Sequence, residues 1–291
     1  MKLINFFTKQ IKDLKNNPKS IRTKFKTLFD LLIKIIFSPL NILITILIIL
    51  LKNIILVRIG FLKTAWIGQM IVMGEIFLIK KKNKPKNCFD ILISDKIISN
   101  KFVFKKLKER ILIINHNFVL VYKIINYLAK KNEYFLEHIS FKIDHCGDSN
   151  QELDLNDQIL KLNESEINYG YEILKKNIKK KYKGIVLYCV RNNYYYNLNH
   201  PNTDWNHNNF RNYNFEDFIP SIDYLMAKGF LVIRFGSLNE KEIKINNELF
   251  VDYSFCKWKS DFMDFFLGYA CSFCVTTGTG SDEFPKLFRK R

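Results

Sequence analysis

The run Gly184-Ile-Val-Leu-Tyr-Cys-Val190 is the most informative segment for the architecture. An uncharged, almost entirely apolar run is typical of a central parallel strand that is covered on both faces. Two more such strands follow, and a helix pattern comes after each of the three. The predicted strands are 184–190, 230–235 and 271–276, and the predicted helices are 214–229, 258–269 and 282–288. This alternation at short spacing predicts a parallel α/β sheet.

Candidate ligand-binding groups follow directly after these strands. They are Arg191 after the first strand, Arg234 and Gly236 at the end of the second, and a turn made of Thr277, Gly278, Thr279, Gly280 and Ser281 after the third. In an open parallel sheet, ligands gather beyond the carboxyl ends of the strands. Guanidinium groups bind phosphate oxygens two at a time, and a helix N-terminus favours anions. We therefore expect a diphosphate site at this edge.

Each of these features also has an ordinary structural interpretation. A Gly-x-Gly turn often does no more than join a strand to a helix, and Arg191 has acidic residues available as ion-pair partners. Asp282 and Glu283, which follow the turn, would repel a phosphate. The argument for a site therefore rests on the shared edge rather than on any single feature.

The loop between the first two strands combines aromatic and polar side chains. It contains Tyr194, Tyr195, Tyr196, His200, Asp204, Trp205, His207, Arg211 and Asn212. Aromatic rings stack on the apolar face of a sugar while polar groups bind its hydroxyls, so the loop is a candidate sugar-binding segment. His207 and Asp204 are a candidate acid–base pair. The alternative is a surface loop rich in Asn and Tyr because of genome base bias.

The first 53 residues are basic and apolar. Residues 1–34 carry nine Lys/Arg and two Asp, with apolar residues every three to four positions, as in a basic amphipathic helix. Residues 35–51 are uncharged but include Ser38, Pro39, Asn41 and Thr45. This length is at the lower edge of the roughly 17–25 residues that span a bilayer. We expect a helix on the cytoplasmic face of a membrane; a buried core helix and a true span are the alternatives.

Between the two halves, short strands are predicted at 54–58, followed by a turn at Ile59-Gly60, and at 88–94. Residues 142–170 are polar and acidic, and a Lys-rich helix is predicted at 171–183. This is the main composition shift in the chain. We therefore expect a membrane-associated segment at 1–53, an α/β domain at 54–165 and a second α/β domain at 166–291.

Composition excludes several classes of protein and partner. The 291 residues are 48% hydrophobic and 25% charged, which excludes a disordered chain and a disulfide-dense miniprotein. A net charge of +18 attracts nucleic acid, anionic lipid or phosphorylated substrates. Because no recognition-helix, RRM or KH pattern occurs, we expect no nucleic-acid partner. The sequence is also rich in Lys, Ile and Asn, as expected from genome base bias, and this weakens any argument from charge.

The six cysteines are scattered along the chain, at Cys88, Cys146, Cys189, Cys256, Cys271 and Cys274. Most of them lie in apolar runs, so we predict buried thiols in a reducing compartment. Cys271-Ser-Phe-Cys274 has C-x-x-C spacing, but a structural zinc site usually needs a second such pair or a pair of histidines. We expect no metal and no cofactor.

Several short motifs recur in an order that carries a resemblance. They are Arg58-Ile-Gly60, Ile67-Gly-Gln-Met70, Glu75-Ile-Phe-Leu78, Tyr188-Cys-Val-Arg191, Asp204-Trp205, Phe210-Arg211-Asn212, Val232-Ile-Arg-Phe-Gly236 and Thr277-Gly-Thr-Gly-Ser281. This order resembles a family of bacterial glycosyltransferases found with surface-polysaccharide genes. That family is distantly similar to fucosyltransferase-type enzymes of the GT-B architecture. The resemblance covers residues 55–80 and 184–291.

The resemblance implies two Rossmann-like domains that bind a nucleotide-sugar donor between them without an obligatory metal. Arg191 and Arg234 would then neutralise the donor diphosphate, residues 277–281 would hold the phosphates or the ribose, and residues 194–212 would shape the sugar site. The acceptor, a cell-envelope polysaccharide or lipid-linked glycan, would meet the first domain near Arg58, Gly60 and Gln69. Together with the apolar N-terminus, the motif order implies a membrane-associated transferase of polysaccharide biosynthesis.

This chain departs from the family pattern in three places. The family has His where Gln69 stands, and an amide cannot act as a general base. It has Asp where Asn192 stands. Finally, the chain stops at Arg291, so we expect an incomplete second domain. A catalytically impaired protein of the same fold that binds a membrane surface is therefore the alternative to an active transferase.

Overall fold

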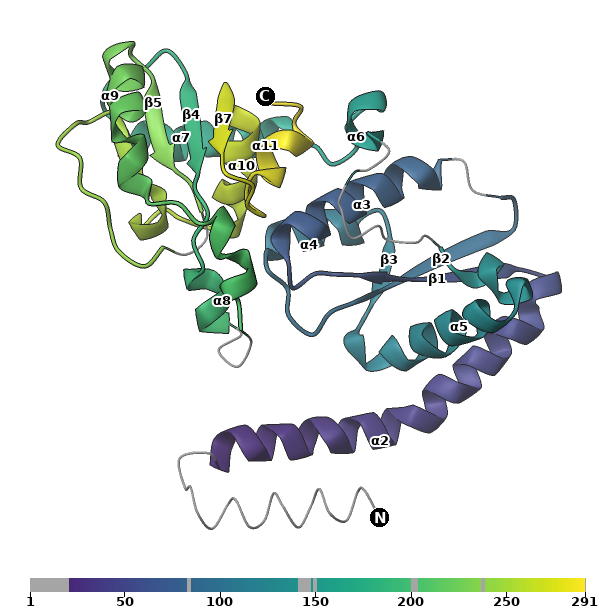
Figure 1. Ribbon diagram of the computed structural model, residues 1–291. Coiled ribbons are helices and arrows are strands. Elements are labelled where there is room, and N and C mark those ends of the chain that lie inside the picture. Colours follow the sequence, from purple (N-terminus) through teal and green to yellow (C-terminus); the bar gives the residue numbers. More distant parts are fainter. Residues whose placement is uncertain are drawn as a thin grey trace. The chain divides into compact units, whose positions relative to one another are not determined.

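The computed structural model describes residues 21–82, 85–140, 148, 151–199, 204–236 and 239–290. Four parallel strands form the larger of its two sheets, in the order β6-β5-β4-β7. Figure 1 shows β5, β4 and β7 of this sheet side by side. The strands are β4 (Ile185–Cys189), β5 (Leu231–Arg234), β6 (Phe250–Asp252) and β7 (Phe273–Thr276). Every residue of β4 is buried, as a strand with neighbours on both sides requires. The predicted parallel α/β sheet is confirmed, and β6 is an additional edge strand.

Helices cover this sheet and bury its apolar side chains. From α9 (Ile219–Ala227), Ile222 and Met226 join Val186 and Val232 in one core cluster. The other helices of the second half are α7 (Glu164–Asn177), α8 (Tyr194–Asn199), α10 (Asp261–Ala270) and α11 (Glu283–Leu287), with 3-10 turns η5 (Asn206–Arg211), η6 (Phe215–Phe218) and η7 (Tyr253–Phe255). Of the Lys-rich helix predicted at 171–183, only residues 171–177 are helical, as the end of α7, and the prediction is wrong for residues 178–183. The helix α7 starts at a capping box formed by Asn163 and Glu166.

Segments from the first half complete the same compact unit. The unit comprises Leu62–Pro85, Ser94–Ile113 and Phe141–Arg291. It therefore includes α3 (Ile67–Lys81), α4 (Lys101–Lys108) and α6 (Glu152–Leu155). The fully buried carboxylate of Glu75 in α3 accepts hydrogen bonds from the backbone N–H groups of Ile159 at 2.6 Å and Leu160 at 3.0 Å. These bonds tie the helix to the polar segment before α7.

A second compact unit contains Met1–Phe61, Lys86–Ile93 and Ile114–Ser140. The smaller sheet has the order β1-β2-β3, with β1 (Leu56–Leu62), β2 (Cys88–Ser94) and β3 (Leu112–Ile114), and this unit contains most of β1 and β2. The remaining elements are α2 (Ile21–Leu50), α5 (Val119–Lys131), and the 3-10 turns η2 (Leu51–Asn53), η3 (His116–Phe118) and η4 (Glu133–His138). The core of this unit gathers Ile48 of α2, Val57 and Ile59 of β1, Ile93 of β2 and Val121 and Ile125 of α5.

The long helix α2 runs through Pro39 without a break. Within it and η2, residues Ile35–Asn53 are long and apolar enough to cross a membrane by length and composition, and only 17% of this stretch is buried. A core helix of a soluble protein and a signal sequence can have the same length and composition. Residues 1–20 of the predicted amphipathic helix 1–34 lie outside the described residues.

The predicted turn at Ile59-Gly60 is wrong, because both residues lie inside β1, where they are buried. Isoleucine is apolar and glycine has no side chain, so both residues fit a covered strand. Both compact units are built from segments that are separate in the sequence, whereas the expected domains 54–165 and 166–291 are contiguous ranges. These domain bounds stay a prediction.

Candidate functional site

A pocket of about 130 Å³ lies at the carboxyl ends of β4, β5 and β7. A single water needs about 10–15 Å³ on this scale, so the pocket has room for about ten. The lining residues all belong to one compact unit; they are Ile67, Ser99, Val190, Arg191, Asn192, Phe235, Gly236, Asn239, Asp264, Thr279, Gly280, Ser281 and Phe284. Three strand-end segments therefore meet at one edge, as expected for a parallel sheet.

Arg191 is the cationic residue of the pocket lining, and it is 6% exposed. Its backbone N–H donates to the hydroxyl of Thr277 at 2.9 Å, and its carbonyl accepts from the N–H of Tyr213 at 3.2 Å. These bonds join the end of β4 to the turn after β7 and to the loop before α9. The strand-end position and the two backbone bonds hold the arginine at the pocket.

The turn after β7 is built around Gly278, whose φ of +80° favours glycine. The carbonyl of Gly278 accepts a hydrogen bond from Arg211 at 2.6 Å, and its N–H donates to the hydroxyl of Thr276 at 3.0 Å. The hydroxyls of Thr279 and Ser281 are 2.7 Å apart, and the N–H of Ser281 donates to Thr279 at 3.1 Å. Much of the polar surface of the turn is therefore used internally.

The sequence predicts that the N-terminus of the helix after the glycine turn helps to bind an anion, and the structure does not support this prediction. The helix that follows the turn, α11, has only five residues, so few peptide dipoles align there. Its first turn carries Glu283, and burial raises the pKa of that carboxyl. Asp282 is buried and accepts a hydrogen bond from Thr276 at 2.8 Å. The binding of an anion in the pocket must therefore depend mainly on Arg191 and on polar groups of the loops.

The first turn of α3 lies directly against the glycine turn. A Cβ added at Gly68 would be 3.0 Å from the Cα of Gly280 and 3.1 Å from its carbonyl oxygen. The ring of Trp66, just before α3, meets that of Trp205 edge to face at 6.2 Å. Gln69 is half-buried in the same helical turn and does not line the pocket. The structure thus brings Ile67 to the pocket but leaves Gln69 beside it.

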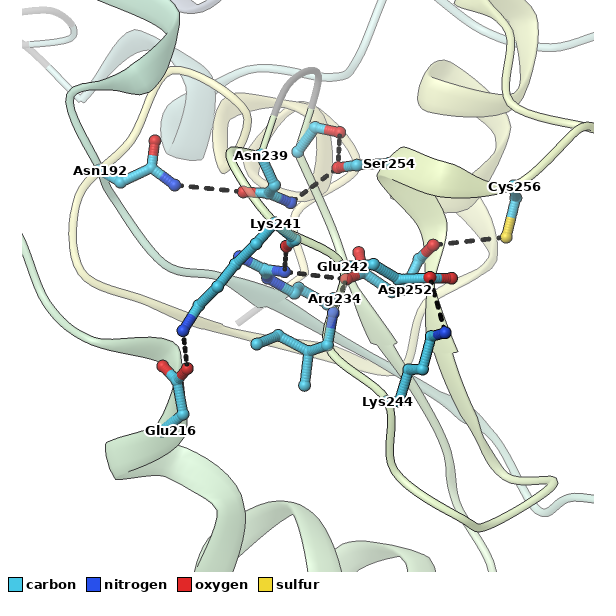
Figure 2. A network of polar contacts seen from close by, with 12 residues as sticks. Asn192, Glu216, Arg234, Asn239, Lys241, Glu242, Lys244, Asp252, Ser254 and Cys256 are labelled. Atoms are coloured by element: carbon cyan, nitrogen blue, oxygen red, sulfur yellow. Dashed lines mark hydrogen bonds and ion pairs between the residues drawn. The ribbon is translucent and has the colours of Figure 1, made fainter.

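Arg234 has partners that differ from those expected. Its Nη1 atom is 2.8 Å from Oδ2 of Asp252 on the adjacent strand β6, and it donates to the carbonyl of Lys241 at 2.9 Å (Figure 2). Its guanidinium also lies over the ring of Phe215, 4.7 Å from the ring centroid. The charge is therefore already neutralised, and Arg234 is not among the residues that line the pocket. The structure does not bring the two expected arginines together in this cavity.

A series of hydrogen bonds between amide and hydroxyl side chains joins the segments that follow β4 and β5. Asn192 donates to the side-chain oxygen of Asn239 at 3.2 Å, and Asn239 donates to Ser254 at 2.7 Å (Figure 2). Ser254 in turn donates to the carbonyl of Gly236 at 3.0 Å. Asn192 thus gives this side of the pocket a neutral hydrogen-bonding surface.

The loop that the sequence suggests for sugar binding is only partly tied to the pocket. Arg211 contacts the glycine turn, whereas Asn212 donates to Asn209 at 3.2 Å and Tyr194 is half-buried at the start of α8. Asp204 is exposed and accepts from the N–H of Asn206 at 2.9 Å. The side chain of His207 lies outside the described part of the chain. The acid–base pair with Asp204 therefore stays a prediction.

Arg58 belongs to the other compact unit, where it forms a double hydrogen bond with Asp90 at 2.7 and 3.1 Å. This bond raises the pKa of the guanidinium, and the Asp90 side chain is only 2% exposed. Gly60 is buried inside β1 of that unit. The ion pair joins the strands β1 and β2. An acceptor-binding role for Arg58 and Gly60 stays a prediction.

Asp264 is a pocket residue that the sequence analysis does not single out. It lies in the first turns of α10, where an acid commonly complements the helix dipole, so its type and position carry no special signal. It is 9% exposed, and burial raises its pKa to about 6. Tyr253 donates a hydrogen bond to its Oδ1 atom at 2.8 Å.

No cluster of three or more His, Cys, Asp and Glu side chains among the described residues is arranged to hold a metal ion. Five cysteines fall within the described ranges, namely Cys88, Cys189, Cys256, Cys271 and Cys274, and none of these five forms a disulfide. Burial raises the pKa of Cys271 to about 12 and that of Cys256 to about 11. The thiols of Cys271 and Cys256 are therefore protonated and unreactive near neutral pH.

The fold and pocket define a parallel α/β protein with a ligand-sized cavity at the carboxyl edge of its sheet. No family model matches the chain, and no curated protein matches it. A solved structure of E. coli ADP-heptose LPS heptosyltransferase II matches 80% of this chain and 82% of its own, with 12% identity and a TM-score of 0.43. A likeness this distant carries no argument about family or activity.

Proposed function

We propose that this chain is a membrane-associated bacterial protein of the glycosyltransferase kind, which binds a nucleotide-sugar donor. Its acceptor would be a cell-envelope polysaccharide or a lipid-linked glycan. The observation that supports the donor site is the convergence of the segments after β4, β5 and β7 on one pocket that contains a buried arginine. A cavity at a parallel sheet edge that combines apolar walls with a buried arginine and a few other polar groups suits a phosphorylated ligand.

In this proposal Arg191 neutralises the phosphates of the donor. A guanidinium that lies in a largely buried site interacts more strongly with a dianion than it would in water. Thr279, Gly280 and Ser281 contact the phosphates or the ribose, and the segment 194–212 contributes to the sugar site. Catalysis would be mainly electrostatic stabilisation of the departing nucleotide. Arg234 acts as a positioning residue, because its pair with Asp252 holds the end of β5 against β6.

Attachment to the cytoplasmic face of the inner membrane is the second part of the proposal. One face of α2 packs on its own unit: Asn41 and Thr45 are buried, and Asn41 donates to the carbonyl of Asn117 at 3.1 Å. Large apolar side chains remain exposed along α2, namely Phe29, Leu32, Ile35, Ile36, Leu40, Ile42, Leu43, Ile46, Leu47 and Leu50. A helix anchored to protein on one face and apolar on another suits the plane of a membrane better than a span surrounded by lipid.

Titration of the purified protein with UDP-, GDP-, ADP- and CMP-sugars tests the donor site. Saturable binding of one of them, together with nucleotide release, supports the transferase. Failure to bind any of them contradicts it. A steeply salt-dependent affinity for DNA or RNA, with no affinity for nucleotide sugars, would instead indicate a nucleic-acid binder.

The second candidate is a binding protein of the same fold that has lost turnover. Gln69 favours it, because this amide stands where the resembling family has a histidine and cannot exchange a proton at neutral pH. This candidate predicts donor binding without nucleotide release. Replacement of Gln69 by His should then restore release if the missing histidine is the cause.

A further inference from the structure

The pocket contains an acid whose surroundings suit proton transfer. Asp264 is on the pocket wall, and its side chain has partners in η7 and at the start of α4. Its Oδ1 atom accepts from the hydroxyl of Tyr253 in η7 at 2.8 Å. Its Oδ2 atom has a longer contact, 3.5 Å, with the side-chain amide of Asn100, the N-cap residue of α4. One oxygen is therefore firmly held, and the other is held weakly.

The charges around Asp264 do not neutralise it. Within the described ranges, no lysine or arginine forms an ion pair with this carboxylate. Lys259 and Asp261, on its own segment, act in opposite directions on it. Arg191 lines the same pocket from the end of β4. A carboxylate that is buried and unpaired is a stronger base than one in water, because burial penalises its charged form.

We infer that Asp264 is the general base of this site and takes the proton of the acceptor hydroxyl, an inference that rests on the proposed function. The acceptor oxygen forms a bond to the anomeric carbon, and its proton passes to Oδ2 of Asp264. The bond between the anomeric carbon and the phosphate oxygen breaks, and the nucleotide leaves with the electron pair. Asp264 then returns the proton to water. Neither Gln69 nor Asn192 is needed for this step.

A purely structural interpretation of Asp264 makes a different prediction. Asp264 also helps to join η7, α10 and the start of α4, since it accepts a hydrogen bond from Tyr253 of η7 and contacts Asn100, the N-cap residue of α4. Asp264→Asn keeps the size of the side chain and an oxygen that accepts from Tyr253. If the residue only held these elements together, this variant would retain most of its activity.

The test uses the full chain and measures nucleotide release from UDP-, GDP-, ADP- and CMP-sugars, with water as the acceptor. For Asp264→Asn we expect a donor Kd within about twofold of wild type but release slowed by about 10² or more, the usual range for a lost general base. The wild-type rate should fall as the pH drops below about 6, where Asp264 becomes protonated. Asp264→Glu, which keeps a carboxyl group, should restore part of the rate with a displaced pH limb.

Asp223→Asn is the matched control, because Asp223 is an exposed acid on α9 outside the pocket lining. It should leave both the rate and the pH profile unchanged. Wild-type release in Asp264→Asn, with the acidic limb retained, would overturn the base assignment while leaving the donor site intact. Donor binding by wild type without release would overturn the base and the transferase but not the binding site. If the wild-type protein binds no donor, the base assignment, the transferase activity and the donor site are all overturned.

Discussion

Gly68 and Gly280 lie backbone against backbone, so that a Cβ at Gly68 would approach the Cα of Gly280 to 3.0 Å. This contact joins the start of α3 to the turn after β7, although more than two hundred residues separate them in the chain. Because Ile67 and Gly280 both line the pocket, the contact helps to set the shape of one wall.

Gly68→Ala should destabilise the protein by about 1–3 kcal/mol, because the methyl group meets backbone that has little room to move. It should also weaken donor binding. Urea unfolding and ligand titration measure the two effects. Gly236→Ala is a control for stability, since its Cβ would meet only Asn239, at 3.8 Å. Equal stability of the two variants would contradict the close approach.

Arg191→Ala should weaken nucleotide-sugar binding about tenfold or more, because a charge-assisted hydrogen bond contributes about 1.5–3 kcal/mol. Isothermal titration of wild type and variant measures the change. Arg110→Ala removes an exposed arginine outside the pocket lining and should leave the affinity unchanged. An unchanged affinity in folded Arg191→Ala would remove this residue from the donor site.

Arg234→Met should affect folding more than ligand affinity. It leaves Asp252 buried without its cation, which typically costs about 3–5 kcal/mol. Adding Asp252→Asn to the same protein should recover part of the loss, because the unpaired charge is then gone. Denaturant midpoints of the single and double variants test this coupling. A large loss of donor affinity with unchanged stability would instead return Arg234 to the phosphate site.

Tyr253→Phe should move the acidic limb of the pH–rate profile to higher pH. The hydrogen bond from Tyr253 favours the carboxylate form of Asp264 and so lowers a pKa that burial has raised to about 6. Its removal raises that pKa, so a higher pH is needed to form the base. Initial rates of nucleotide release between pH 5 and 8, each compared with wild type, reveal the direction. A limb that moves to lower pH would contradict the assignment.

Leu43→Glu should reduce binding to vesicles that contain anionic lipid by at least about tenfold, because full burial of a leucine contributes about 1.5–3 kcal/mol. Leu43 is 54% exposed on α2. Leu155→Glu changes an equally apolar, exposed residue in α6 and should not affect flotation with the same vesicles. Equal flotation of both variants would contradict membrane contact through α2.

The parallel sheet follows from local patterns in the sequence. The strands β4, β5 and β7 are short apolar runs with helix patterns between them, and such runs need cover on both faces wherever they lie. The edge at which Arg191, Gly236 and the glycine turn meet was predictable for the same reason, since parallel strands place their carboxyl ends together. The interruption of the apolar stretch by Asn41 and Thr45 was visible too, but not that these residues would be buried against their own unit.

Pairings between distant segments are a different matter, because they depend on which elements become neighbours in space. Arg234 has a strand-end position that suits phosphate, yet β6 adds to β5 and brings Asp252 to within 2.8 Å of it. Asp264 looks like an ordinary acid in the first turns of a helix, and only the packing of η7 and α4 around it creates a buried, unpaired carboxylate in a pocket. Periodicity and residue type indicate local preferences, whereas ion pairs and buried charges are created by tertiary contacts. The sheet could therefore be predicted from the sequence, but the chemistry at its carboxyl edge could not.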